Sequence, residues 1–412
     1  MRGARGATLA DSIGGKTDPL RPNTVVVAAA GLLLLGGAAA LTPGFGWRQA
    51  TLYLIGGALG LTLYHATFGF AASWRVFLAD GRGAGLRAQM LMLAVATLLF
   101  FPVLADGTLF GRAVGGALAP VGVSVLVGAF VFGIGMQLGG ACASGTLYTA
   151  GSGNTRTMLT LPAFIAGAFL ATAHFPWWLD RPSYGEISII REYGLGRALV
   201  LQLAVLAAIV GVTIVLERRR HGSLVSLTEG APAGIGQLWR GPWPLAWGAL
   251  ALALLNFATL AVAGHAWSVT YGFTLWGAKL AAAAGLDFSG WTFWSWPYQR
   301  AALANSVFGN TVSVMNFGIL AGALLAAGLA GRFAPVWRIP PRPMLAAVLG
   351  GLAMGYGARL AFGCNIGAFF SGVASGSLHG WLWLAAAMAG TAVGTALRPM
   401  FGLGVERSKA AA

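Results

Sequence analysis

Two cysteines are the residues of this chain whose type and spacing are most suited to chemistry. Cys142 and Cys364 are the only cysteines in 412 residues, and both lie in apolar, glycine-rich stretches. A thiol is a soft, polarizable and weakly hydrogen-bonding group, which suits a ligand that carries a sulfur or selenium atom. No second thiol lies nearby in sequence, so thioredoxin-like disulfide chemistry is not indicated. The alternative is that each cysteine is a small buried apolar residue.

The segments around the two cysteines are copies of one motif. Residues 133–145 and 355–367 share five identities at one constant spacing: three glycines, a leucine and the cysteine. Glycines next to each cysteine predict that one helix ends and a short helix begins there. The free N–H groups and partial positive charge of such a helix start favour an anion. The glycines expected to shape this path are Gly140, Gly145, Gly363 and Gly367.

Polar residues in the two copies are further candidates for the substrate path. Arg359 precedes Cys364 by five residues, and Gln137 holds the matching place before Cys142. An arginine at membrane depth is costly and suggests function, although it could also snorkel or pair with a carbonyl. Asn365 and Ser144 could donate hydrogen bonds to a bound anion, or could cap helices.

Composition indicates the elements that must position these residues. The chain is 57% hydrophobic and only 9% charged, whereas about 25% of residues are charged in soluble domains. Apolar runs of about 20 residues recur, long enough to cross the bilayer as helices. The runs are continuous rather than alternating, which favours helices over a barrel. The fold class expected is therefore an all-α polytopic membrane protein, with the lipid bilayer as its surroundings.

About ten spans are expected, together with four stretches too short or too broken to cross. The spans are near 24–41, 47–68, 86–104, 120–138, 158–175, 197–216, 244–263, 312–330, 344–362 and 381–397. The weak stretches are 71–79, 142–153, 270–285 and 364–376. Non-helical or half-helical backbone at membrane depth is tolerated only beside protein or a water-filled cavity. We therefore expect these stretches to be re-entrant half-helices lining a path.

The chain is expected to divide into two halves. Residues 1–23 are a polar N-terminal segment, 24–216 the first transmembrane half, 217–241 a basic hinge, 242–398 the second half and 399–412 a tail. The spans that carry the two cysteine motifs run in opposite directions in this topology. Inverted repeats of this kind build transporters whose substrate site lies at the repeat interface near the midplane.

Basic residues set the expected orientation. The net charge of +15 comes from arginines in short gaps between apolar runs, which follows the positive-inside rule rather than a nucleic-acid-binding pattern. Arg2, Arg5, Lys16 and Arg21 place the N-terminus in the cytoplasm; Arg407 and Lys409 place the C-terminus there. The high Gly, Ala, Leu and Arg content favours a bacterium, hence its inner membrane. The aromatic group at 291, 294, 296 and 298 is expected to be an interfacial belt.

The motifs resemble those of the YeeE/YedE family of membrane proteins. The resemblance rests on both glycine–cysteine motifs, on residues 271–279, and on Phe68-Gly69-Phe70 leading to Trp74-Arg75. It implies uptake of thiosulfate, or a link to selenium metabolism, and a relay of the substrate by thiol hydrogen bonds along an hourglass-shaped path. Cys142 and Cys364 match two of the family's path cysteines. Many members have a further cysteine where this chain has Gly69.

The function expected is a permease for a small sulfur-containing anion such as thiosulfate, and not an enzyme. No metal-ligand spacing, nucleotide loop or catalytic triad is present in the sequence, so no cofactor is expected. One alternative is a selenium-compound transporter. Another is a non-transporting membrane subunit, with a cytoplasmic sulfur-handling protein as its partner at the basic hinge; a third is a channel for a small neutral solute.

Overall fold

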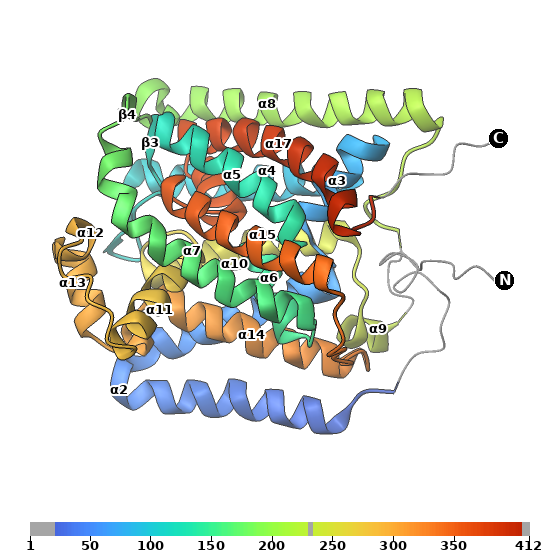
Figure 1. Cartoon of the computed structure of the whole chain (residues 1–412). Coiled ribbons are helices and arrows are strands. Elements are labelled where there is room, and N and C mark those ends of the chain that lie inside the picture. The colour runs from blue at the N-terminus through green and yellow to red at the C-terminus, as the bar shows by residue number, and fades with distance from the viewer. Residues whose placement is uncertain (1–20, 230–233, 406–412) are drawn as a thin grey trace.

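A bundle of helices makes up most of the protein (Figure 1). The computed structural model describes residues 21–229 and 234–405. Nine helical stretches among these residues are long and apolar enough to cross a membrane. The first includes α2 (Thr24–His65), which bends at Gly46, where φ is +82°, so that its two arms pack on each other. Counting these arms separately gives ten crossings, which confirms the expected all-α polytopic class.

The remaining long helices agree closely with the spans expected from the sequence. They are α4 (Ala84–Asp106), α5 (Val123–Gly139), α7 (Thr155–Leu179), α8 (Ile189–His221), α10 (Leu245–Ala263), α14 (Thr311–Leu329), α15 (Pro341–Leu360) and α17 (Leu378–Leu397). Short strands in the loops form two antiparallel pairs: β1 (Thr108–Leu109) with β2 (Arg112–Ala113), and β3 (Pro120–Gly122) with β4 (Ser183–Glu186).

The four weak stretches form short helices between the long ones. They are α3 (Phe70–Asp80), α6 (Ala143–Gly151), α11 (Thr270–Ala283), and η2 (Asn365–Phe370) continued by α16 (Ser371–Ala374). Other short helices are α9 (Ile235–Arg240), α12 (Thr292–Ser295), α13 (Pro297–Ala304), η1 (Val307–Gly309) and η3 (Arg398–Phe401). Residues 1–20, 230–233 and 406–412 lie outside the described part, and with them Arg2, Arg5, Lys16, Arg407 and Lys409.

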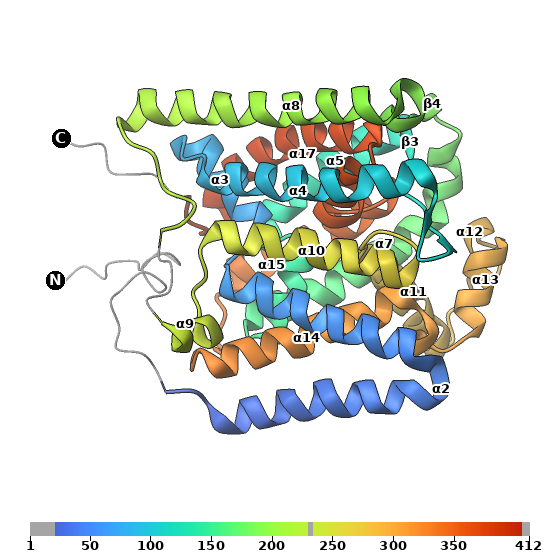
Figure 2. The ribbon, with the colours of Figure 1, turned by 180° about the vertical axis from the view of Figure 1, so that it is seen from behind.

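The bundle has two ends, which we call the hinge face and the cap face. At the hinge face α8 ends at His221 and α4 and α10 begin, so the connection from α8 to α10 runs across it (Figure 2). At the cap face α2 bends, and α12, α13 and η1 form a cap between α11 and α14. The connection from α3 to α4 at the hinge face has only the residues 81–83, so the cap is an addition to one end.

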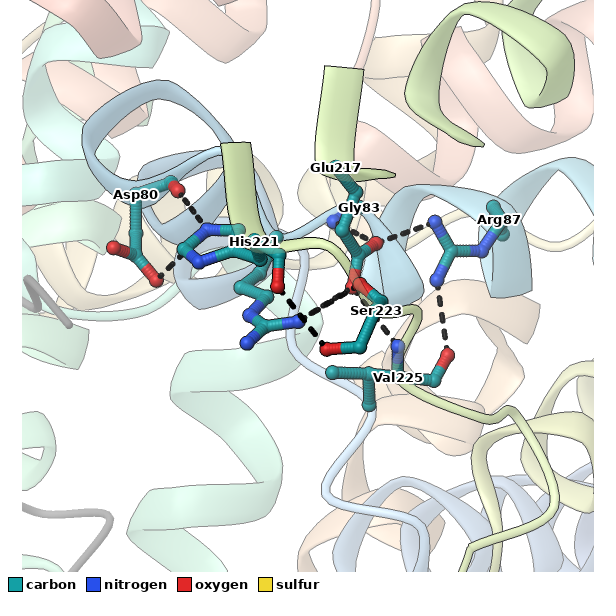
Figure 3. A network of polar contacts seen from close by, with 8 residues as sticks. Asp80, Gly83, Arg87, Glu217, His221, Ser223 and Val225 are labelled. Atoms are coloured by element: carbon teal, nitrogen blue, oxygen red, sulfur yellow. Dashed lines mark hydrogen bonds and ion pairs between the residues drawn. The ribbon is translucent and has the colours of Figure 1, made fainter. Parts of the chain in front are cut away.

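A buried carboxylate anchors the start of the hinge (Figure 3). Glu217 accepts hydrogen bonds from Arg87 at 2.6 Å, Arg82 at 3.3 Å, and the backbone N–H groups of Gly83 and Val225 at 2.9 Å each. Its side chain is fully buried. The beginning of the expected hinge is therefore helical and held to the turn between α3 and α4.

Close packing of α5 against α15 depends on glycines. A Cβ added at Gly350 would lie 2.2 Å from the backbone nitrogen of Gly139, and one at Gly357 would lie 2.4 Å from the carbonyl oxygen of Gly128. Because Gly350 faces the end of α5 and Gly357 faces its beginning, the two helices run antiparallel. Small residues let helices approach this closely in membranes. The two helices that lead into the cysteine motifs therefore cross backbone to backbone.

The helix contacts repeat when the two halves are exchanged. Helix α5 packs on α17 as α15 packs on α7, and α4 packs on α10 as α14 packs on α2. The short helices follow the same rule, since α3 packs on α17 as α11 packs on α7, and α16 on α4 as α6 on α14. Together with the antiparallel run of α5 and α15, this matching is the pattern expected of two inverted repeats.

One sequence expectation is wrong for part of the aromatic group at 291–298. Trp294 is buried and donates its indole N–H to Thr172 Oγ1 at 3.0 Å, so it does not face lipid headgroups. Phe293 is buried beside it. These residues pack the cap onto the end of α7. The connection from α11 to α14 thus forms a small hydrophobic core with α7 and α11.

Candidate functional site

Cys142 lies inside the bundle at the start of α6. Its side chain is 2% exposed, and its Sγ accepts a hydrogen bond from the Gly145 N–H at 3.3 Å. The Ser144 hydroxyl lies 3.4 Å from the same sulfur. The sulfur therefore acts as the N-cap of the short helix, a place usually taken by Ser, Thr, Asp or Asn.

Cys364 occupies the matching place at the start of η2. It is fully buried, and its Sγ accepts from the Ile366 N–H at 3.4 Å. Helix α6 contacts η2, so the fold brings the two cysteine segments together although they lie 222 residues apart in the chain (364 minus 142). Gly367 lies against Ser268, whose Oγ is 3.2 Å from where a Cβ would be.

Two of the predicted glycines take backbone conformations that reverse the chain before each cysteine. Gly140 ends α5 with φ +90°, and Gly363 follows α15 with φ +156°. Both values disfavour residues with a Cβ. A Cβ at Gly363 would also lie 2.6 Å from the Ala368 nitrogen. These glycines let each long helix end and each short helix begin within a few residues.

Asn365 is a polar side chain of the motifs that has no hydrogen-bond partner among the described residues. It is fully buried, and neither its amide nitrogen nor its amide oxygen forms a hydrogen bond. Since the adjacent thiol supplies the helix cap, Asn365 is not needed for capping. An unpaired buried amide costs free energy, so its presence beside Cys364 favours a polar ligand there.

Gln137, by contrast, is fully engaged within the protein. Its Oε1 accepts from Arg75 at 3.0 Å, and its Nε2 donates to the Ala71 carbonyl at 3.0 Å. Its own carbonyl accepts from Arg398 at 2.6 Å. Gln137 thus joins α3 to the end of α5 near Cys142.

Arg359 faces the cap. Its guanidinium carbon lies 4.5 Å from the ring centre of Phe175 and 5.3 Å from that of Phe293. Phe175 belongs to α7 and Phe293 to α12. Within the described residues Arg359 forms no ion pair, and its buried Nε has no hydrogen-bond partner.

Sequence reasoning missed two residues next to the site. Arg156, in the first turn of α7, donates to the Leu138 carbonyl and lies over Gly140, so it helps to close the end of α5. Tyr271, in the first turn of α11, has a buried hydroxyl with no partner. Tyr271 belongs to a stretch that the sequence singled out, but no spacing rule connected it to Arg359.

The groups at the site are suited to binding an anion. Both cysteines are free thiols, and each sulfur accepts a backbone N–H. The neighbouring polar groups are an amide and a hydroxyl, which suit hydrogen bonding to an anion. Among the described residues, no cluster of three or more His, Cys, Asp or Glu side chains could hold a metal ion.

Comparisons with known proteins agree with these features. The family model described as "Sulphur transport" matches residues 65–393, which include both cysteine motifs. The chain is 30% identical over 270 residues to the thiosulfate transporter TsuA of Spirochaeta thermophila, covering 63% of this chain and 73% of that protein.

Two further relatives are shorter matches. The probable transporter YedE of Escherichia coli is 32% identical over 165 residues, and its Salmonella typhimurium counterpart is 32% identical over 172 residues. The alignments cover 40% of the Escherichia coli protein and 42% of the Salmonella typhimurium protein. The chain therefore spans about two fifths of the length of these two relatives. All three relatives are named as transporters rather than enzymes. This chain belongs to the sulphur transport family, the YeeE/YedE family that its cysteine motifs resemble.

Proposed function

We propose that this protein is a permease for a small sulfur-containing anion, with thiosulfate as its substrate. The observation that carries the proposal is the pairing of the two cysteine motifs. Each thiol lies at the start of a short helix, inside the bundle, at the end of one of two antiparallel glycine-packed helices. A relative that is named as a thiosulfate transporter supports the substrate.

The thiols would act by binding the substrate without a covalent step. The outer sulfur of thiosulfate is soft and accepts a weak hydrogen bond from a thiol, while the Asn365 amide can donate to its oxygens. Cys364 and Cys142 lie on contacting segments, so the anion can pass from one thiol to the other. Each contact is weak, which allows release as well as capture.

The hinge face would lie in the cytoplasm of a bacterial inner membrane, with the cap face outside. Arg82, Arg87 and Arg218–Arg220 are at the hinge face, and arginines are retained on the cytoplasmic side. Both termini would then be cytoplasmic. The repeated contacts favour a boundary before α8 instead of the one expected at residues 217–241. One repeat would start at the first arm of α2 and the second at α8, since α8 packs on α4 as α2 packs on α14.

Two alternatives remain as outcomes of the experiment. The permease could carry a selenium-containing anion, because selenium shares the softness of sulfur. The protein could instead be a subunit that supports a cytoplasmic sulfur-handling enzyme docked at residues 217–241. The contacts of Glu217 and of His221, which is 2.7 Å from the Asp80 carbonyl, leave fewer hinge side chains for such docking.

The experiment is uptake of labelled thiosulfate by cells that lack their own sulfur importers. We expect uptake with the wild-type protein and its loss with Cys142→Ala and with Cys364→Ala, at equal amounts of protein in the membrane. Wild-type protein that is present but takes up only selenium compounds would support the first alternative. Uptake that survives removal of both thiols would contradict the thiol path.

A further inference from the structure

The Arg359 guanidinium is an unneutralised charge below the cap. It is held between the rings of Phe175 and Phe293, at 4.5 Å and 5.3 Å. Its Nε is buried without a hydrogen-bond partner, and no carboxylate among the described residues pairs with it. The rings can stabilise the cation, but they cannot accept its N–H groups in the plane of the guanidinium. Among the described residues the buried Nε–H therefore has no acceptor.

A second unpaired donor lies on α11, a helix that packs against the helix of Arg359. The Tyr271 hydroxyl is buried and has no partner. Tyr271 packs against the same hydrophobic cluster as Phe175 and Phe293, whose rings lie beside the Arg359 guanidinium, and helix α11 packs on α15. Two donors with no acceptor, one of them cationic, form a site whose complement is an anion with oxygen acceptors.

A cavity at the cap face extends to Tyr298, the ring neighbour of Tyr271. It has a volume of about 710 Å³ and is lined by α2 at its bend, the end of α10, and the cap. Tyr298 of α13 lines it, and the Tyr298 ring lies 5.3 Å from the ring of Tyr271. Arg48 and His265 line it too. This volume is within the range of small-ligand sites, about 300–1,000 Å³.

We propose that Arg359 and Tyr271 form an oxyanion-binding site that captures the substrate at the cap face before Cys364 meets its sulfur. Arg359 supplies the charge, Tyr271 supplies a neutral donor, and Phe293 brings the cap over the site. Among residues 21–229 and 234–405 the cap lies at one end of the bundle, so this site belongs to one mouth of the path. The inference rests on the proposed function for its substrate, a small sulfur oxyanion.

The test is equilibrium binding of thiosulfate to the purified full-length protein, followed by tryptophan fluorescence and by calorimetry. Tyr271→Phe removes one hydroxyl that has no protein partner. We expect the dissociation constant to rise about tenfold, because a hydrogen bond to a charged group is lost. Thermal stability should stay the same or rise, since an unpaired buried polar group is removed. Arg359→Lys, which keeps the charge but loses the guanidinium, should also weaken binding.

A matched control is Tyr53→Phe. The Tyr53 hydroxyl donates to the Leu33 carbonyl at 2.9 Å, so its loss should lower stability and leave thiosulfate binding unchanged. Tyr271→Phe that binds thiosulfate as tightly as the wild type would overturn the proposal, and Phe175, Phe293 and Arg359 would then be a structural clamp for the cap. This assay measures binding without transport. A protein that binds thiosulfate but does not transport it would therefore contradict the proposed permease function and leave the binding site supported.

Discussion

Replacing Gly350 by alanine should force apart the two helices that carry the cysteine motifs. The new Cβ would lie 2.2 Å from the Gly139 nitrogen and 2.7 Å from the Gly135 oxygen. Ordinary contacts of a Cβ are 3.4–4 Å, so the backbones must separate by about 1.2 Å (3.4 minus 2.2). All the atoms met are backbone, so no side chain can turn aside. Overpacking of this kind costs about 1–3 kcal/mol.

The matched control is Gly31→Ala in the first arm of α2. No atom lies within 4 Å of the Cβ that this change adds, and alanine is the better helix former by about 1 kcal/mol. Thermal unfolding of both purified variants in detergent should show a lower midpoint for Gly350→Ala and no decrease for Gly31→Ala. Thiosulfate uptake should fall for Gly350→Ala alone, because α5 and α15 both end at the cysteine loops. Equal midpoints and equal uptake for the two variants would refute the reasoning.

Two more predictions concern the hinge face. Gly69→Cys should fold normally, because the nearest atom to the added Cβ is 3.8 Å away. The position is partly exposed, so the new thiol should react with a water-soluble maleimide added from the hinge face. The two native thiols should stay unreactive until the protein unfolds. Absence of labelling from either side would contradict this geometry. Glu217→Gln should lower the unfolding free energy by about 3 kcal/mol, because it leaves the buried Arg87 without its counter-charge. An unchanged denaturation midpoint would show that the network is not needed for stability.

Much of the fold could be predicted because the membrane restricts the chain so strongly. Apolar runs gave the long helices within a few residues at most ends, and glycine interruptions gave α3, α6, α11 and the η2–α16 segment. The duplicated motif also predicted that Cys142 and Cys364 begin short helices. These are local properties of the sequence, since an apolar run predicts a membrane-spanning helix and a glycine next to a small residue predicts where a helix ends.

The residue contacts across the bundle could not be predicted in the same way. Gln137 and Arg359 occupy matching positions, yet one is bonded to α3 and the other lies against α7 and the cap. That difference comes from the connection between α11 and α14, which has no counterpart between α3 and α4. Tyr271 and Arg359 reach the same hydrophobic cluster only after α11 packs on α15, and the sequence of one chain does not report such pairs. The capping of each short helix by a sulfur was likewise visible only in the structure.

Thiosulfate uptake by the purified protein in liposomes is the most direct test of the thiol path. The comparison is between the wild type and the double variant Cys142→Ser, Cys364→Ser. Serine is a good N-cap, so the short helices should keep their caps and the protein its stability while the soft sulfur atoms are lost. The thiol path predicts uptake by the wild type and none by the double variant. Equal uptake by both would show that the cysteines are only caps and would contradict the account.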